Sequence, residues 1–178
     1  MDISERLRTA IETSVLCWLA TVDANGQPNV SPKEIFCMGE GANEVLVAEI
    51  ASPVTKRNIA ENPKVCISAI DIFAQKGIKA HGTATLLTPE DMDFATIVQP
   101  LMRMAGPGFK IRAIVRVAVS KVAPIVAPSY AIFPERTEEE QRRRAFETYG
   151  VKAAESEGPE RDDAPRRSAW EVSRKHGR

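Results

Sequence analysis

Two adjacent cations, Lys56 and Arg57, stand near the start of a short predicted helix that follows an apolar strand. Ser52 is a good helix N-cap, and Pro53 suits the first helical position because its missing N–H would have no partner there. Cations at this end oppose the helix dipole, which favours negative charge by about 0.3–1 kcal/mol per group. The pattern is therefore typical of a phosphate site formed by backbone N–H groups, the Ser52 and Thr55 hydroxyls and the two cations. The alternative is a solvated basic helix face.

Two buried strands are expected to position this helix. Val45–Ile50 precedes it and Val65–Ile70 follows it. Asn62 and Pro63 end the helix, because the residue before a proline is pushed out of helical geometry. The helix is then about three turns long.

The composition of the whole chain limits what this site can serve. The chain has 178 residues, with 24 Lys and Arg against 24 Asp and Glu, so no overall charge favours nucleic acid or an anionic membrane. The N-terminus lacks the apolar core of a signal peptide, and no apolar run approaches the roughly 20 residues of a membrane span. Cys17, Cys37 and Cys66 are widely spaced, which argues against a disulfide framework or a structural zinc site. We expect a cytoplasmic protein.

Short strands dominate the chain before residue 134. The patterns predict a helix over Asp2–Thr13, a hairpin of Val15–Val22 and Pro28–Phe36, a strand over Gly77–Leu87, a helix over Thr88–Met104 and β-rich residues 111–123. Two prolines in Pro28–Phe36 indicate an edge or bulged strand. Several short strands with few helices favour a small antiparallel barrel.

The composition changes after Pro134. Residues 135–178 carry 11 basic and 11 acidic residues. Thr137–Glu140 is a capping box, and Phe146 and Tyr149 lie about one turn apart on an otherwise charged helix that Gly150 can end. We therefore divide the chain into a barrel domain, residues 1–134, and a charged helical extension with a polar tail, residues 135–178. The helix is expected to pack on the barrel or on a partner subunit.

The order of these segments resembles the pyridoxamine 5′-phosphate oxidase-like family of flavin-binding split barrels. The residues that carry the likeness are Gly26–Lys33, Val45–Ile50, Ser52–Ile59, Glu61–Val65 and Gly77–Leu87. The resemblance covers roughly residues 5–130 and rests on order and spacing, since no single motif is as specific as a Walker loop. It implies a mainly β fold with flanking helices, a six-stranded antiparallel split barrel that forms a homodimer with FMN between its subunits.

The resemblance also implies which residues contact FMN. Lys56 and Arg57 match the basic pair that takes the phosphate, and Ser52 and Thr55 fall where small hydroxyl residues assist it. The other expected contacts lie along the flavin ring: Asn29, Val30, Ser31, Lys33, Gln75 and Lys79. A flavin needs positive charge near N1 and O2 when it is reduced, which Lys33 or Lys79 would supply. For both lysines an ordinary surface role is the alternative.

Departures from the family pattern argue against vitamin B6 oxidation. At the positions where the true oxidase binds the phosphate of its substrate, this chain has Ala95, Gln99 and a poorly matched Arg103. We expect an FMN-dependent oxidoreductase that passes hydride or electrons between a reductant and a small substrate. The alternatives are a flavin-binding protein without its own turnover, and a relative that binds deazaflavin or haem.

Most of the remaining chemically active residues are expected to have structural roles. His81 is expected to be a hydrogen-bonded strand residue and His176 a tail residue, while Cys37 is the one candidate for a reactive thiol. Trp18 is expected in the core or in a dimer interface, and Trp170 in the tail. No Gly-x-Gly-x-x-Gly is present, so NAD(P)H would bind transiently over the flavin.

Overall fold

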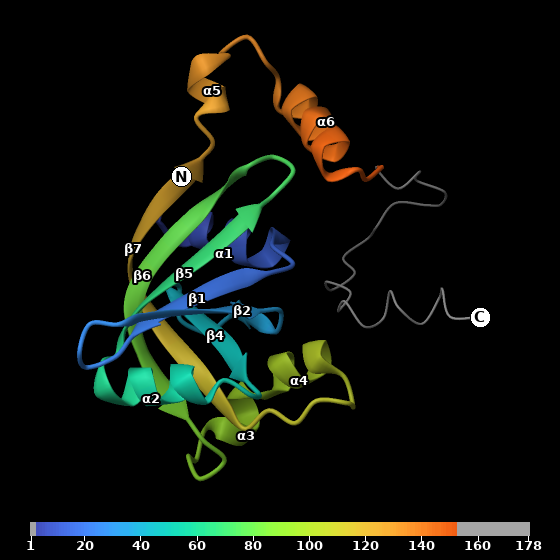
Figure 1. Cartoon of the computed structure of the whole chain (residues 1–178). Coiled ribbons are helices and arrows are strands. Elements are labelled where there is room, and N and C mark those ends of the chain that lie inside the picture. Colours follow the sequence, from blue (N-terminus) through green and yellow to red (C-terminus); the bar gives the residue numbers. More distant parts are fainter. Residues whose placement is uncertain (1–2, 153–178) are drawn as a thin grey trace.

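One curled antiparallel sheet carries the fold, and helices pack around it. In the computed structural model, which describes residues 3–152, seven strands pair in the order β2-β1-β5-β6-β7-β4-β3 (Figure 1). The strands are β1 (Cys17–Val22), β2 (Pro28–Lys33), β3 (Phe36–Met38), β4 (Glu44–Glu49), β5 (Lys64–Asp71), β6 (Lys76–Leu87) and β7 (Ala113–Val126). The helices are α1 (Ile3–Thr13), α2 (Pro53–Glu61), α3 (Phe94–Ile97), α4 (Gln99–Ala105), α5 (Ser129–Ile132) and α6 (Glu138–Tyr149). The mainly β class with flanking helices is confirmed.

The expected strand Pro28–Phe36 is in fact two strands, which raises the count in the described residues from six to seven. Pro28 and Pro32 cannot donate to a ladder, and β2 accordingly lies at one edge of the sheet beside β1. The chain then crosses at residues 34–35 to the opposite edge, where β3 pairs with β4. The Ala48 amide donates to the Ile35 carbonyl over 2.9 Å and ties this crossing to β4. The prolines predict the edge position but not the break.

Two apolar clusters hold the sheet and its helices together. In the larger cluster, Leu7 and Ile11 of α1 are fully buried against inward side chains of the sheet such as Val47. In the smaller cluster, Leu101 of α4 packs with Leu46 on the other face of β4. β4 is therefore buried on both faces, as its continuous apolar run predicts.

The helix expected from Thr88 to Met104 begins later and is broken. Residues 88–91 form a turn, in which the Asp91 carboxylate accepts hydrogen bonds from the Thr88 amide (2.7 Å) and hydroxyl (3.1 Å). The chain becomes helical only at Phe94, where α3 begins. Pro100 lies in the first turn of α4, and its missing N–H interrupts the hydrogen-bond series that would join α3 to α4.

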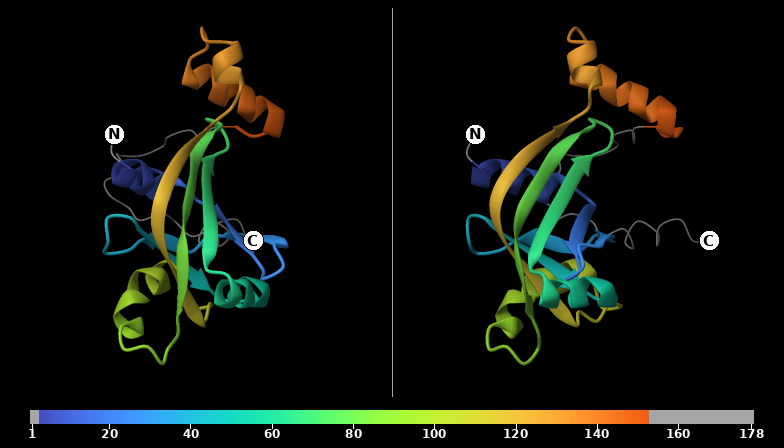
Figure 2. Two further views of the ribbon diagram at one scale, coloured as in Figure 1. Left: turned by 90° about the vertical axis from the view of Figure 1, so that its left-hand side faces the viewer. Right: turned by 60° about the vertical axis from the view of Figure 1, so that its left-hand side comes forward.

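The two side views show how the helices are distributed along the sheet (Figure 2). β5, β6 and β7 reach up to the end that carries α5 and α6, while α2, α3 and α4 lie at the opposite end. α6 has the predicted capping box between Thr137 and Glu140, and Gly150 ends it with a φ of 65°. Trp170, His176 and the rest of the tail lie outside the described residues. Within residues 3–152, no helix is long and apolar enough to cross a bilayer.

Candidate functional site

α2 begins where the sequence predicts, but the Ser52 side chain makes no capping hydrogen bond. Ser52 occupies the N-cap position, Pro53 lies in the first turn, and the Lys56 amide donates to the Ser52 carbonyl over 3.2 Å. Lys56 is half-buried and Arg57 is exposed. The pKa of Glu90 is lowered, chiefly by a hydrogen bond from Thr88 and to a smaller extent by the charge of Lys56. The two cations of the predicted anion site therefore lie at the surface, beside the first turn of the helix.

A buried ion pair lies beneath this turn. Glu49 ends β4 and is 1% exposed, and Lys33 ends β2 and is 8% exposed. The Lys33 Nζ atom lies 3.4 Å from Glu49 Oε2 and donates to Ser52 Oγ over 2.6 Å. The other carboxylate oxygen of Glu49 accepts the Ser52 amide. Because the ion pair binds both the hydroxyl and the amide of Ser52, it fixes the position at which the chain enters α2.

The contact between β2 and α2 continues beyond this ion pair, where Ser31 of β2 faces Thr55 of α2. We call this contact, which runs from Lys33 and Ser52 to Asn29 and Asn58, the seam. The two hydroxyl oxygens lie 3.2 Å apart, and Thr55 is only 1% exposed. Residues 29, 31 and 33 share one face of β2 because strand side chains alternate, and residues 52, 55 and 58 share one face of α2. Five of the expected FMN contacts thus come together in this seam: Asn29, Ser31, Lys33, Ser52 and Thr55.

At the end of the seam, hydrogen bonds join Asn29, Thr21 and Asn58. The Thr21 hydroxyl oxygen accepts from the side-chain amides of Asn29 (3.2 Å) and Asn58 (3.1 Å). Asn58 is 1% exposed, and its Oδ1 atom is buried without a partner. Glu49, Thr21 and Asn58 are not among the expected contacts. For Asn58 a signal exists in the sequence, because it follows Ser52 and Thr55 at intervals of three residues on a helix.

Two other expected contacts, Val30 and Lys79, lie on the outer face of the sheet. Val30 is 56% exposed, and its neighbour across the ladder is Ala20 of β1. Lys79 is exposed opposite Ser68, which in turn lies opposite Trp18. Trp18 is 42% exposed, so it lies at the surface of the sheet and not in the core.

Gln75 lies far from α2. It follows β5, and β5 begins at Lys64, three residues after α2 ends. The eight residues of β5 therefore separate the two along the sheet, by roughly 25 Å at about 3.3 Å per residue. Figure 1 shows α2 at one end of the molecule and the turn between β5 and β6 at the other. Within one chain, Gln75 and the α2 cations do not meet.

The cysteines and histidine of the described residues offer little further chemistry. Cys17 is buried, and Cys37 and Cys66 are half-buried. Burial raises the pKa of Cys66, and the nearby charge of Lys79 partly offsets this. His81 is exposed on β6. Among residues 3–152, no group of three or more His, Cys, Asp or Glu side chains could hold a metal ion.

Comparison with known proteins finds one family and many similar structures. The family model described as pyridoxamine 5′-phosphate oxidase matches residues 3–125, and therefore ends before α5 and α6. No curated protein sequence matches the chain. HupZ of Group A Streptococcus is 26% identical with a TM-score of 0.56, over 68% of this chain and 92% of that one. An FMN-binding protein from Syntrophomonas wolfei is 20% identical with a TM-score of 0.59, over 69% and 86%. HutZ, the haem storage protein from Vibrio cholerae, is 20% identical with a TM-score of 0.55, over 71% and 95%.

Proposed function

This chain belongs to the pyridoxamine 5′-phosphate oxidase family, and from that premise we propose that it binds FMN and acts as an FMN-dependent oxidoreductase. The observation that carries the proposal is the first turn of α2, with Lys56 and Arg57 beside it and Ser52 fixed behind it. A helix N-terminus flanked by cations fits the dianionic phosphate of FMN. When bound, FMN would supply hydride transfer.

Lys33 contributes to this site through Glu49. The Glu49 carboxylate accepts the Ser52 amide and so lies against the same helix end that would hold the phosphate. An uncompensated carboxylate there would repel a dianion, and the Lys33 ammonium neutralises it. We therefore assign Lys33 to the support of the phosphate site, since its ammonium group is already bound to Glu49 and Ser52.

We further propose that the site is completed by a second copy of the chain. Gln75 and the α2 cations lie at opposite ends of β5, so the expected contacts can meet at one flavin only if two subunits contribute them. The outer face of β1 and β2, with Trp18 42% and Val30 56% exposed, offers apolar surface for a homodimer.

The first test is the absorbance spectrum of the freshly purified protein, followed by chromatography of the released ligand against FMN, FAD, deazaflavin and haem standards. A yellow protein that releases FMN supports the proposal. Release of haem would favour the haem-binding alternative that the similarity to HutZ raises. Within residues 3–152, His81 is the one histidine that could serve as a haem ligand. A colourless protein that binds no added FMN would refute the proposal.

The phosphate assignment is tested by replacing both Lys56 and Arg57 with alanine. Each charge-assisted contact is worth about 1.5–3 kcal/mol, so we expect FMN affinity to fall at least about a hundredfold while the dimer persists in size-exclusion chromatography. The matched control is Arg6→Ala/Arg8→Ala, which removes two exposed cations of α1, outside this site. Unchanged FMN affinity in the Lys56/Arg57 variant would contradict the assignment.

Turnover is a separate question from binding. We propose that NAD(P)H or another small reductant reaches the flavin transiently and that water supplies protons, because the seam offers no free side-chain acid. Anaerobic reduction of the bound flavin by NAD(P)H would support an enzyme. Bound flavin that no donor reduces would favour the carrier alternative, with which the absent substrate-phosphate residues at Ala95 and Gln99 agree.

A further inference from the structure

Residues 71–76, which join β5 to β6, adopt a conformation that needs external support; we call them the β5–β6 tip. Gln75 has a φ of 55°, and it is the one non-glycine residue with positive φ in the part of the chain that the structure describes. A side chain in this backbone region is strained, so the conformation persists only where surrounding contacts fix it. Such outliers are concentrated at ligand sites, and Gln75 is an expected cofactor contact.

Gln141 of α6 provides the most direct of these contacts. Its side chain is buried, at 7% exposed, and its amide nitrogen donates to Gln75 Oε1 over 2.8 Å and to Ser129 Oγ over 2.9 Å. The backbone of Gln75 is held as well, because its carbonyl accepts the Ala127 amide over 3.1 Å. Both the side chain and the main chain of the strained residue are thus bound by residues that follow β7.

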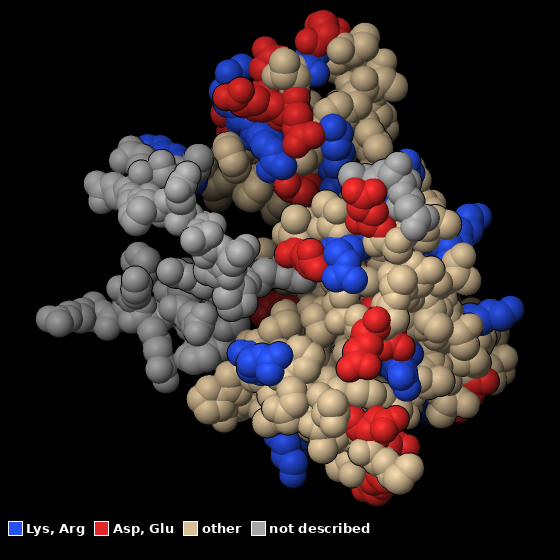
Figure 3. Space-filling view, turned by 180° about the vertical axis from the view of Figure 1, so that it is seen from behind, with Lys and Arg blue, Asp and Glu red and all other residues tan. Residues whose placement is uncertain are grey.

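Arg142, the next residue of α6, holds the start of the tip. Its guanidinium donates to Asp71 Oδ2 over 2.6 Å, while Asp71 Oδ1 accepts the amides of Phe73 and Ala74 at 2.9 Å each. The Phe73 ring packs against Phe146 of α6, with 4.7 Å between ring centroids. Figure 3 shows acidic and basic side chains crowded together over this end of the molecule.

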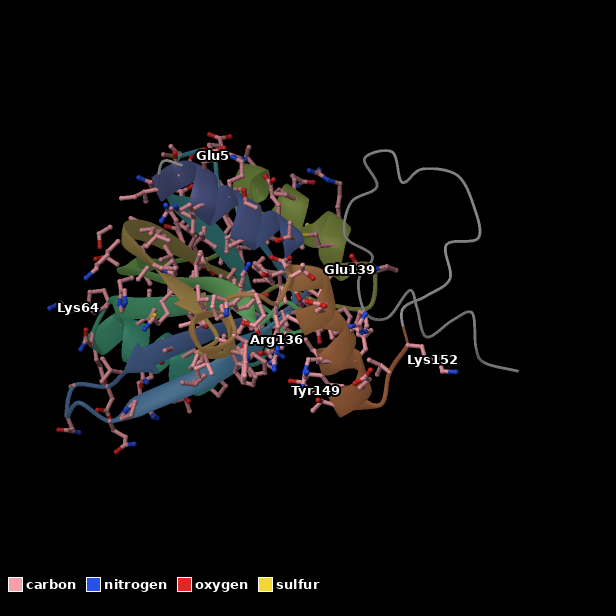
Figure 4. The ribbon with its side chains drawn as sticks, turned by 90° about the horizontal axis from the view of Figure 1, so that it is seen from above. Glu5, Lys64, Arg136, Glu139, Tyr149 and Lys152 are labelled. Atoms are coloured by element: carbon pink, nitrogen blue, oxygen red, sulfur yellow. The ribbon has the colours of Figure 1, made fainter. Side chains whose placement is uncertain are left out.

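We propose that Gln141 and Arg142 are positioning residues, which hold the β5–β6 tip in the conformation from which Gln75 contacts the cofactor. The inference rests on the proposed function. α6 lies beyond the matched family region, which ends at residue 125, so this support is added to the shared barrel. Figure 4 looks down on this end of the molecule and shows α6 beside the sheet, with Glu139 and Tyr149 towards its two ends.

The test compares hydrogen exchange and FMN affinity in the full-length chain. In Gln141→Ala/Arg142→Ala, we expect the tip amides to exchange at least tenfold faster without FMN, and the Kd for FMN to rise at least fivefold. Alanine favours helix, so α6 itself should remain folded. The matched control is Arg143→Ala/Arg144→Ala, which removes two exposed side chains from the same helix and should leave both quantities unchanged.

A second control separates positioning from general loosening. Leu101→Val lowers stability in α4, at the opposite end of the sheet, and should leave unchanged the absorption bands of FMN bound at saturation. The Gln141/Arg142 variant should shift those bands. Unchanged exchange at the tip overturns the inference, and so does faster exchange with unchanged affinity and spectrum. If the wild-type protein binds no FMN, the proposed function fails, and faster exchange then supports only the contact between α6 and the tip.

Discussion

The chain attaches a helix to its sheet at each end, and the two attachments are built in opposite ways. Under α2 the charged groups are buried, with Lys33 8% and Glu49 1% exposed. Under α6 the ion pairs Lys76–Glu138 and Arg142–Asp71 lie in solvent, with their side chains 37–46% exposed. Beside the buried pair, the hydroxyls of Thr55 and Ser31 form a further hydrogen bond between α2 and β2. The exposed pairs instead flank an aromatic contact between Phe73 and Phe146.

Contacts that fix geometry are thus separate from contacts that add stability. A buried ion pair adds little net stability over an apolar pair of similar size, but removal of one partner leaves a buried charge and costs about 3–5 kcal/mol. An exposed pair contributes about 0.2–1 kcal/mol and is screened by salt. We therefore expect α2 to be held in one position, whereas α6 depends mainly on its aromatic contact and loosens by small steps.

The largest effect is expected when the buried pair is broken. Lys33→Met should lower the free energy of unfolding by about 3–5 kcal/mol, because the Glu49 carboxylate would remain buried without its cation. Urea unfolding measures the loss. The double variant Lys33→Met/Glu49→Leu removes both charges and should recover most of the stability. A loss below about 1 kcal/mol in the single variant would show that the seam opens to water and is not rigid.

A smaller effect is expected at the aromatic contact of α6. Phe73→Ala should cost about 1.5–2.5 kcal/mol, below the 3–5 kcal/mol typical of a fully buried phenylalanine, because Phe73 is half-buried. Phe73→Leu keeps apolar volume against Phe146 and should cost less than half as much. If Phe73→Ala costs no more than the loss of one exposed ion pair, the aromatic contact does not dominate at this end, and the comparison between the two ends fails.

Local signals explain why the elements of the α2 end are predictable. Pro53 favours the start of the helix and Asn62–Pro63 its end, each through the chemistry of one or two residues. The pairing of Lys33 with Glu49 is different, because it depends on the crossing between the two edges of the sheet at residues 34–35. Nothing local marks Glu49 as a partner, since in the sequence it ends an apolar strand.

Local sequence signals also fail to identify packing partners at α6, and they misplace the helix start in the α3–α4 region. The capping box and Gly150 predict α6, and the Phe146–Tyr149 pair predicts that it packs on something, but only the fold identifies Phe73 as the partner. At Thr88 the local signal is misleading, because the Asp91 carboxylate closes a turn there and the helix begins later. The assignment of single residues to FMN stays a prediction, because it requires the arrangement of two subunits.

The smallest effect is expected from pH at Asp71. Burial alone would raise its pKa, but hydrogen bonds from the Ala74 amide and the Arg142 guanidinium hold the pKa of Asp71 below its usual value. A carboxyl group with a lowered folded pKa stabilises the protein above its unfolded pKa, about 3.9, and this stabilisation is lost as pH falls through the folded value. At pH 7, Asp71→Asn should therefore cost less than about 1 kcal/mol, since the side chain is 40% exposed.

The pH dependence of that cost gives the sharper test of an exposed attachment. Urea midpoints at pH 7, 4 and 3 should show the difference between wild type and Asp71→Asn shrinking below pH 4, because the wild-type carboxyl group then takes up its proton. The matched control is Asp93→Asn, an exposed aspartate at the start of α3 whose side chain makes no capping hydrogen bond. A difference that is as large at pH 3 as at pH 7 would mean that Asp71 acts only through the hydrogen bonds that it accepts from the Phe73 and Ala74 amides. The charge of Arg142 would then add nothing, and α6 would be held to the β5–β6 tip by Gln141, the Lys76–Glu138 pair and the aromatic rings.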